Sequence, residues 1–114
     1  MSEPKLKAKL FIHAAIRQCS LRFQQAVVAR KGDDDSGTIL VRVIEGRDRN
    51  RVYTQVRDIQ GRLGWMCATG AEAVDDQRAE AYVTRACAVD SDSWVLDVES
   101  PDGKVAFLEP LFSA

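Results

Sequence analysis

A chain of 114 residues, of which 46% are hydrophobic and 29% are charged, can bury an ordinary core as one domain without metal or disulfide support. Its 16 basic and 17 acidic residues leave a formal net charge of −1, which argues against non-specific binding of nucleic acid because that requires a cationic excess. Cys19, Cys67 and Cys87 form no C-x-x-C pair and predict buried, reduced thiols rather than a disulfide framework or a zinc site.

The longest uninterrupted apolar run is far shorter than the ~20 residues needed to span a bilayer, and residues 1–9 lack the apolar core of a secretory signal. These features predict a cytoplasmic protein of bacterial type that does not bind membranes. Internal repeats and long linkers are absent from the sequence. We therefore expect a single α+β domain over residues 1–114, with flexible ends at 1–4 and 110–114.

The first half of the chain predicts one helix followed by four strands. Apolar residues recur every three to four positions between residues 6 and 23, which favours a helix. The β-rich segments 25–31 and 38–45 flank a short loop of Gly, Asp and Ser and are typical of a hairpin. The segments 52–57 and 62–68 follow short turns. They extend the hairpin into a meander, since such connections are too short for a crossover helix.

A second helix is predicted after residue 70, where the apolar period changes. Its apolar stripe consists of Ala79, Tyr82, Val83, Ala86 and Cys87. Either Thr69 with Glu72, or Asp75 alone, can cap its first turn, and the helix is expected to stop at 90–92.

The alternating segment 93–99 predicts a further strand, and the turn Pro101-Asp102-Gly103 predicts a hairpin with residues 104–108. The expected order is therefore α-β-β-β-β-α-β-β. Two helices would pack on one face of a mostly antiparallel sheet of five to six strands, which places the protein in the α+β class.

Two motifs resemble those of a bacterial family known as domain of unknown function 1491. The first is Lys31-Gly32-Asp33 with Gly37, and the second is Asp90-x-Asp92-x-Trp94 running into Asp97-Val98-Glu99. The resemblance spans residues 5–110 and implies an intact domain, but it implies no activity because the family has none assigned.

The chain departs from the family pattern at three serines. Ser36, Ser91 and Ser93 stand where Ala, Pro and an aliphatic residue are usual. The missing proline implies a looser turn before the last predicted hairpin.

The same motifs contain the candidate ligand or metal residues Asp33, Asp35, Asp90 and Asp92. Carboxylates suit Mg²⁺ or Ca²⁺, although the spacing fits neither an EF-hand nor a P-loop. Trp94 could add an aromatic wall for a sugar or a cation and is a candidate surface contact. The alternative is structural: the Asp side chains bond nearby backbone N–H groups and set the two turns, while Trp94 belongs to the core.

Arg47, Arg49 and Arg51 are further candidate surface contacts, because basic residues near aromatic ones can bind RNA or another anion. Interspersed acidic residues dilute their field, which favours an ordinary solvated face. His13 is the single histidine, and nothing in the sequence orients it towards a cysteine.

No catalytic residues or cofactor can be assigned from these patterns. The leading hypothesis is a non-enzymatic interaction or regulatory domain that forms a homodimer or binds another cytosolic protein, since a small sheet has unpaired edges. One alternative is a small metal- or metabolite-binding enzyme, which requires the acidic loops 33–35 and 90–92 to converge. The other is a weak RNA- or anion-binding module that uses the arginines between 47 and 62.

Overall fold

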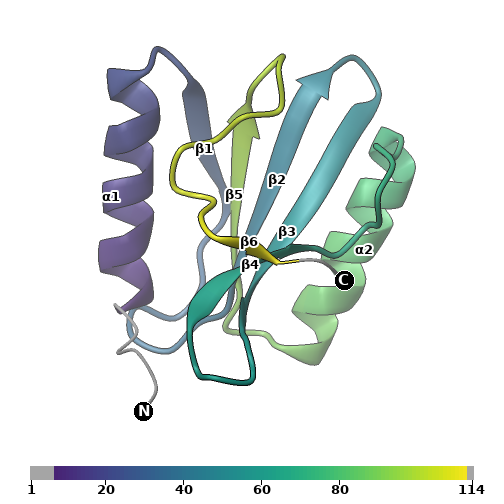
Figure 1. Cartoon of the computed structure of the whole chain (residues 1–114). Helices are drawn as coiled ribbons and strands as arrows, with labels where there is room; N and C mark the ends of the chain where they lie inside the picture. Colours follow the sequence, from purple (N-terminus) through teal and green to yellow (C-terminus); the bar gives the residue numbers. More distant parts are fainter. Residues whose placement is uncertain (1–6, 113–114) are drawn as a thin grey trace.

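The computed structural model describes residues 7–112 and contains both predicted helices and the first five predicted strands in the predicted order, whereas its last strand lies at 111–112 and not at 104–108 (Figure 1). The helices are α1 (Ala8–Leu21) and α2 (Asp76–Val89). The strands are β1 (Gln25–Arg30), β2 (Ile39–Gly46), β3 (Arg49–Arg57), β4 (Leu63–Cys67), β5 (Trp94–Glu99) and β6 (Leu111–Phe112). The α+β class is confirmed, while the expectations for residues 1–4 and 113–114 lie outside the described residues. Asp75 is the cap of α2, because its carboxylate accepts the N–H of Arg78 at 2.8 Å.

The strands form one mixed sheet in the order β1-β5-β2-β3-β4-β6. The meander from β2 to β4 is confirmed. The predicted hairpin between β1 and β2 is wrong, because β5 lies between them, antiparallel to β1 and parallel to β2. The burial of the strands explains this order: β5 has buried apolar residues on both faces, whereas β1 is largely exposed.

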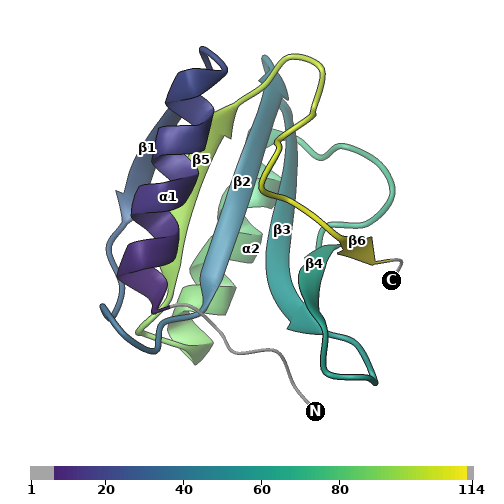
Figure 2. The same cartoon turned by 60° about the vertical axis from the view of Figure 1, so that its left-hand side comes forward.

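The helices cover opposite faces of the sheet, so the prediction of a shared face is wrong. Figure 2 shows α1 in front of the sheet and α2 behind it. On β2, Val41 belongs to the core on the α1 side, and its neighbour Leu40 belongs to the core on the α2 side. Val95 and Leu96 divide in the same way on β5. Strands with apolar residues on both faces need a helix on each side.

The last predicted hairpin is also wrong. Residues 104–108 cross the α1 side of the sheet, and the chain then forms β6, which pairs in parallel with β4 (Figure 1). Both neighbours of β5 are already β1 and β2, so no edge of β5 remains for a hairpin partner. Val105 and Leu108 fill the core instead, and the N–H of Trp65 donates to the carbonyl of Pro110 at 2.9 Å.

Candidate functional sites

The two acidic turns, 32–37 and 90–94, lie directly against each other. The N–H of Asp33 donates to the carbonyl of Asp92 at 3.0 Å, and the indole N–H of Trp94 donates to the carbonyl of Asp33 at 2.7 Å. Gly32 and Gly37 allow this approach, because a Cβ on either glycine would overlap the carbonyl oxygen of Asp92. The turns therefore meet through backbone atoms.

The carboxylates of Asp33 and Asp90 accept hydrogen bonds from groups in or next to the two turns. Asp33 Oδ2 accepts the N–H groups of Ser36 (2.9 Å) and Asp35 (3.0 Å), and these bonds, led by that of Ser36, lower the pKa of Asp33. Asp90 Oδ2 accepts the hydroxyl of Thr38 at 2.8 Å, and Asp90 Oδ1 accepts the N–H of Asp92 at 3.0 Å. Within residues 7–112, no group of three or more His, Cys, Asp or Glu gathers to hold a metal ion. The geometry matches the structural interpretation of both motifs.

Trp94 is a core residue and not a surface contact, since it is only 4% exposed. It packs in the same cluster as Leu96 and Val98. Its alternation with these residues on β5 places all three on the α1 side of the sheet, as expected for the structural alternative.

The candidate arginines are poorly suited to bind an external anion, because Arg49 and Arg51 both pair with the carboxylate of Glu45. Arg51 Nε donates to Glu45 Oε2 at 2.7 Å, and Arg49 Nη2 lies 3.5 Å from Glu45 Oε1. Arg51 also donates to the carbonyl of Ala71 at 2.6 Å. Arg47 is exposed on the turn between β2 and β3.

The histidine and the cysteines do not form a reaction centre in the described part of the chain. His13 is exposed on α1, whereas Cys19 is buried on the same helix. Burial raises the pKa of the Cys19 thiol, which disfavours the reactive thiolate. Cys87 is also buried and Cys67 is half-buried, and all three cysteines are free.

The edge of the sheet at β1 carries exposed apolar side chains, which we call the β1 edge surface. Its members and their exposed fractions are Leu21 (72%), Phe23 (98%), Val27 (52%) and Val28 (36%). Phe23 follows the end of α1 with φ +59°, a left-handed conformation that favours glycine. Its ring is almost completely exposed, so a large apolar residue occupies a strained position without packing in the monomer.

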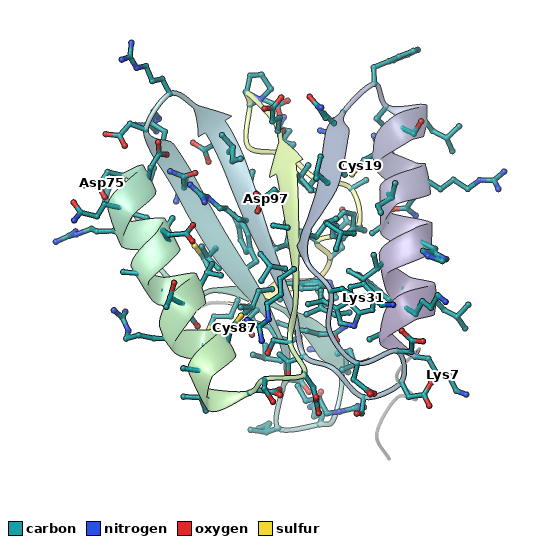
Figure 3. The ribbon with its side chains drawn as sticks, turned by 180° about the vertical axis from the view of Figure 1, so that it is seen from behind. Lys7, Cys19, Lys31, Asp75, Cys87 and Asp97 are labelled. Atoms are coloured by element: carbon teal, nitrogen blue, oxygen red, sulfur yellow. The ribbon has the colours of Figure 1, made fainter. Side chains whose placement is uncertain are left out.

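A groove of about 370 Å³ lies between α2 and β1, over β5, on the face of the sheet opposite α1. Figure 3 views this side of the sheet, with Asp97 labelled on β5 and Cys87 on α2; we call the hollow the β5 groove. Asp97 is half-buried, and its Oδ1 atom is buried without a hydrogen-bond partner among the described residues. A buried acceptor left unsatisfied costs about 1–3 kcal/mol of stability.

Arg42 is the register partner of Asp97 on β2, yet its guanidinium hydrogen-bonds elsewhere. Arg42 Nε donates to Asn50 Oδ1 at 3.0 Å and Nη1 donates to Glu80 Oε2 at 3.2 Å, while Nη2 lies 3.5 Å from Asp76 Oδ1. The guanidinium is therefore held towards α2. Burial is the main reason that the pKa of Asp97 is raised; Arg42 partly opposes this effect and Glu80 adds to it.

A larger hollow of about 1060 Å³ lies beneath residues 102–111. Its polar groups include Gln24, whose Nε2 donates to the carbonyl of Lys104 at 2.8 Å and whose Oε1 is buried with no partner in the described part of the chain. A neutral amide is less costly to leave unpaired than a carboxyl group. The β5 groove is for this reason the stronger candidate for a ligand.

Comparison with known proteins places the chain in a family. A family model described as "Protein of unknown function (DUF1491)" matches residues 6–108. The chain belongs to this family. The resemblance seen in the two sequence motifs is confirmed, and the motifs correspond to the pair of turns that meet at Gly32, Gly37 and Asp92.

Solved structures agree with this assignment. A crystal structure of a DUF1491 family protein from Caulobacter crescentus CB15 is 30% identical, with a TM-score of 0.84 over 95% of this chain and 100% of that chain. An NMR structure of a DUF1491 family protein from Caulobacter crescentus CB15 is also 30% identical, with a TM-score of 0.82 over 97% of this chain and 100% of that chain.

A third structure shows the shared fold alone. The solution structure of protein Atu0922 from A. tumefaciens is 23% identical, with a TM-score of 0.79 over 97% of this chain and 98% of that chain. No curated protein matches the chain. Within residues 7–112 of this DUF1491 chain, no helix has the length and apolar character needed to cross a membrane.

The sequence patterns did not single out Asp97 as a site residue. It appeared there only as part of the DUF1491 motif Asp97-Val98-Glu99. The available signal was a carboxylate in the middle of a strand whose one other charged residue is the terminal Glu99. This carboxylate stands two positions after Val95 and therefore on the same face. An acid on a strand that is buried on both faces is a candidate functional residue.

We expect Asp97→Asn to stabilise this DUF1491 fold by on the order of 1 kcal/mol at pH 7, because the buried charge is removed. The folded-state pKa of Asp97 is raised, so the charge destabilises the fold at neutral pH, and this effect disappears as pH falls through the folded pKa towards the unfolded value. The gain should accordingly shrink towards pH 4. Urea unfolding at several pH values measures it, and an unchanged or lower stability at pH 7 would contradict the burial of this charge.

Proposed function

We propose that the chain is a non-catalytic association domain that forms a homodimer through the edge of β1. The observation that carries this proposal is Phe23, which is 98% exposed in a left-handed conformation beside an edge strand. Large apolar side chains at such a position gain stability when a partner covers them. Val27 and Val28 add exposed apolar side chains, one on each face of β1.

The sequence of β1 supports pairing with another strand. Natural edge strands are commonly protected by charged residues, proline or bulges. In β1 the bulge between Val28 and Arg30 and the charge of Arg30 come late, so the four residues from Gln25 to Val28 carry no protection of this kind. The opposite edge is the short strand β6 (Leu111–Phe112).

A second copy of the chain suits this edge. Antiparallel pairing about a two-fold axis at Val27 would set Val27 opposite its own copy and Ala26 opposite Val28, so no like charges would face each other. The same register would bring Phe23 towards Arg30 and Lys31 of the second copy, where a cation can lie over the aromatic ring. The free N–H and C=O groups of both edges would then pair, as in β-strand addition.

We expect the protein to run as a dimer at high micromolar concentration, and Val27→Lys to weaken dimerisation at least about 10-fold, since like charges meet near the two-fold axis. Ile59→Lys is the matched control, because Ile59 is fully exposed on the turn between β3 and β4. Size-exclusion chromatography with light scattering measures both. A wild-type protein that stays monomeric at several hundred micromolar, or equal dimerisation of the two variants, would refute the proposal.

Phe23→Gly separates association from folding in the same assay. Glycine relieves the left-handed strain, so the monomer should gain roughly 0.5–1 kcal/mol of stability. Dimerisation should nevertheless weaken, because the exposed ring is lost. A variant that loses both stability and association would show instead that Phe23 supports the monomer.

A further inference from the structure

The β5 groove contains an acceptor that the fold itself leaves unused. Asp97 lines the groove, and its Oδ1 atom has no hydrogen-bond partner among residues 7–112. The nearest cation in register, Arg42, is bound by Asn50, Asp76 and Glu80. Its side chain is only 15% exposed, which leaves it little freedom to turn back. The donor that Asp97 lacks can therefore come from a ligand in the groove.

The pairing of the charges around the groove leaves one acceptor for a cation. Arg30 and Arg42 line the groove together with the carboxylates of Glu80 and Asp97, and Asp76 approaches Arg42 from outside the lining. Asp76 and Glu80 share Arg42, which leaves Asp97 as the carboxylate of this group with no ion-pair partner among the described residues. An ammonium would supply that partner, because it forms a strong charge-assisted hydrogen bond with a carboxylate.

The rest of the groove is apolar and suits the stem of such a ligand. Val83, Cys87 and Ala88 of α2 form one wall, Val95 lies on the floor, and Ala29 of β1 faces them. A volume of about 370 Å³ is within the range of small-molecule sites, which combine apolar walls with a few placed polar groups. Arg30 at the rim donates through Nη2 to the carbonyl of Ser91 at 3.1 Å.

We propose that the β5 groove binds a primary ammonium group carried on an apolar stem, with Asp97 as its acceptor. A rotation about χ2 of Asp97 can present either carboxylate oxygen to the ligand. Free alkylamines and lysine side chains share this chemistry. The proposal is independent of association through β1.

The test titrates n-butylamine into the full chain and follows ¹H–¹⁵N NMR spectra, with n-butanol as the neutral probe. We expect saturable shifts at the amides of Cys87, Val95 and Asp97, with a Kd on the order of millimolar for so small a ligand. n-Butanol should bind at least about 10-fold more weakly, because it lacks the charge. Stronger binding of Nα-acetyl-lysine methylamide than of n-butylamine would identify a lysine side chain as the natural source, and equal binding a free amine.

Two variants and a control locate the site. Asp97→Asn should weaken binding at least about 10-fold, and Ala88→Trp, at an exposed position on the groove wall, should abolish it while keeping the carboxylate. Asp34→Asn removes an exposed carboxylate from the 32–37 turn and should leave binding unchanged. The same spectra report whether each variant is folded. Binding that survives in Asp97→Asn, equal binding of n-butanol, or the absence of saturable shifts up to tens of millimolar would overturn the proposal.

Discussion

Replacing Gly37 with alanine is expected to lower the free energy of unfolding by at least about 3 kcal/mol, at the upper end of the usual cost of overpacking. A Cβ at this position would overlap the carbonyl oxygen of Asp92 and lie 2.9 Å from Cδ1 of the Trp94 indole. The first obstacle is a backbone atom, which no rotamer change can move aside. The two turns would have to separate, and the hydrogen bond from the Trp94 indole to the carbonyl of Asp33 would be lost.

Urea unfolding followed by circular dichroism measures this loss, and Ser36→Ala in the same turn is the control. Ser36 is exposed, and its hydroxyl makes one 3.0 Å bond to Asp33 Oδ2, so its removal should cost only about 0.5–1 kcal/mol. Similar losses for the two variants would mean that Gly37 is not needed for the contact between the turns. A large difference would assign the first DUF1491 motif to backbone packing.

Asn50→Ala is expected to lower the free energy of unfolding by about 2–4 kcal/mol, because it breaks a buried polar network. Asn50 is fully buried, and its side chain makes three hydrogen bonds: it donates to Asp76 Oδ1 (2.7 Å) and to the carbonyl of Val74 (3.3 Å), and it accepts from Arg42 Nε (3.0 Å). The network joins β2, β3 and the first turn of α2. Alanine would leave Arg42 Nε and Asp76 Oδ1 without these partners, while the carbonyl of Val74 would keep its bond from the backbone N–H of residue 50.

Arg49→Ala is the control for this variant, because Arg49 precedes Asn50 on β3 and its side chain is 61% exposed. Its loss should change stability by less than about 0.5 kcal/mol. Equal effects of the two substitutions in urea unfolding would contradict the importance of the network.

The same network bears on the proposed ligand. Asn50 holds Arg42 towards α2, where Arg42 pairs with Glu80 and Asp76. Within residues 7–112, Asp97 thereby remains without an ion pair, although Arg42 is its register partner on the adjacent strand. The fold thus maintains an unpaired carboxyl group at a cost in stability, which is common where a residue is kept for binding.

Local patterns predicted most of the elements. The apolar stripe through Ala79, Val83 and Cys87 fits α2, and Asp75 begins it, because capping and periodicity depend on residues close in sequence. The sequence of the loop 32–37 fits a hairpin between adjacent strands, and it fits equally a connection that passes over an intervening strand. Pairing between β5 and its neighbours is non-local, so no short pattern could distinguish these cases.

The sequence by itself determined the α+β class, the order of the two helices and the first five strands, and the membership in DUF1491 carried by two turn motifs. Only the tertiary structure decided that β5 separates β1 from β2, that the helices take opposite faces, and that Asp97 lines a groove with its Oδ1 atom unpartnered among residues 7–112. The physical reason is that the environment of a side chain depends on strands distant in sequence. An aspartate on a strand can be exposed, paired or unpaired, and here the hydrogen bonds of Arg42 to Asn50 and Glu80 decide which.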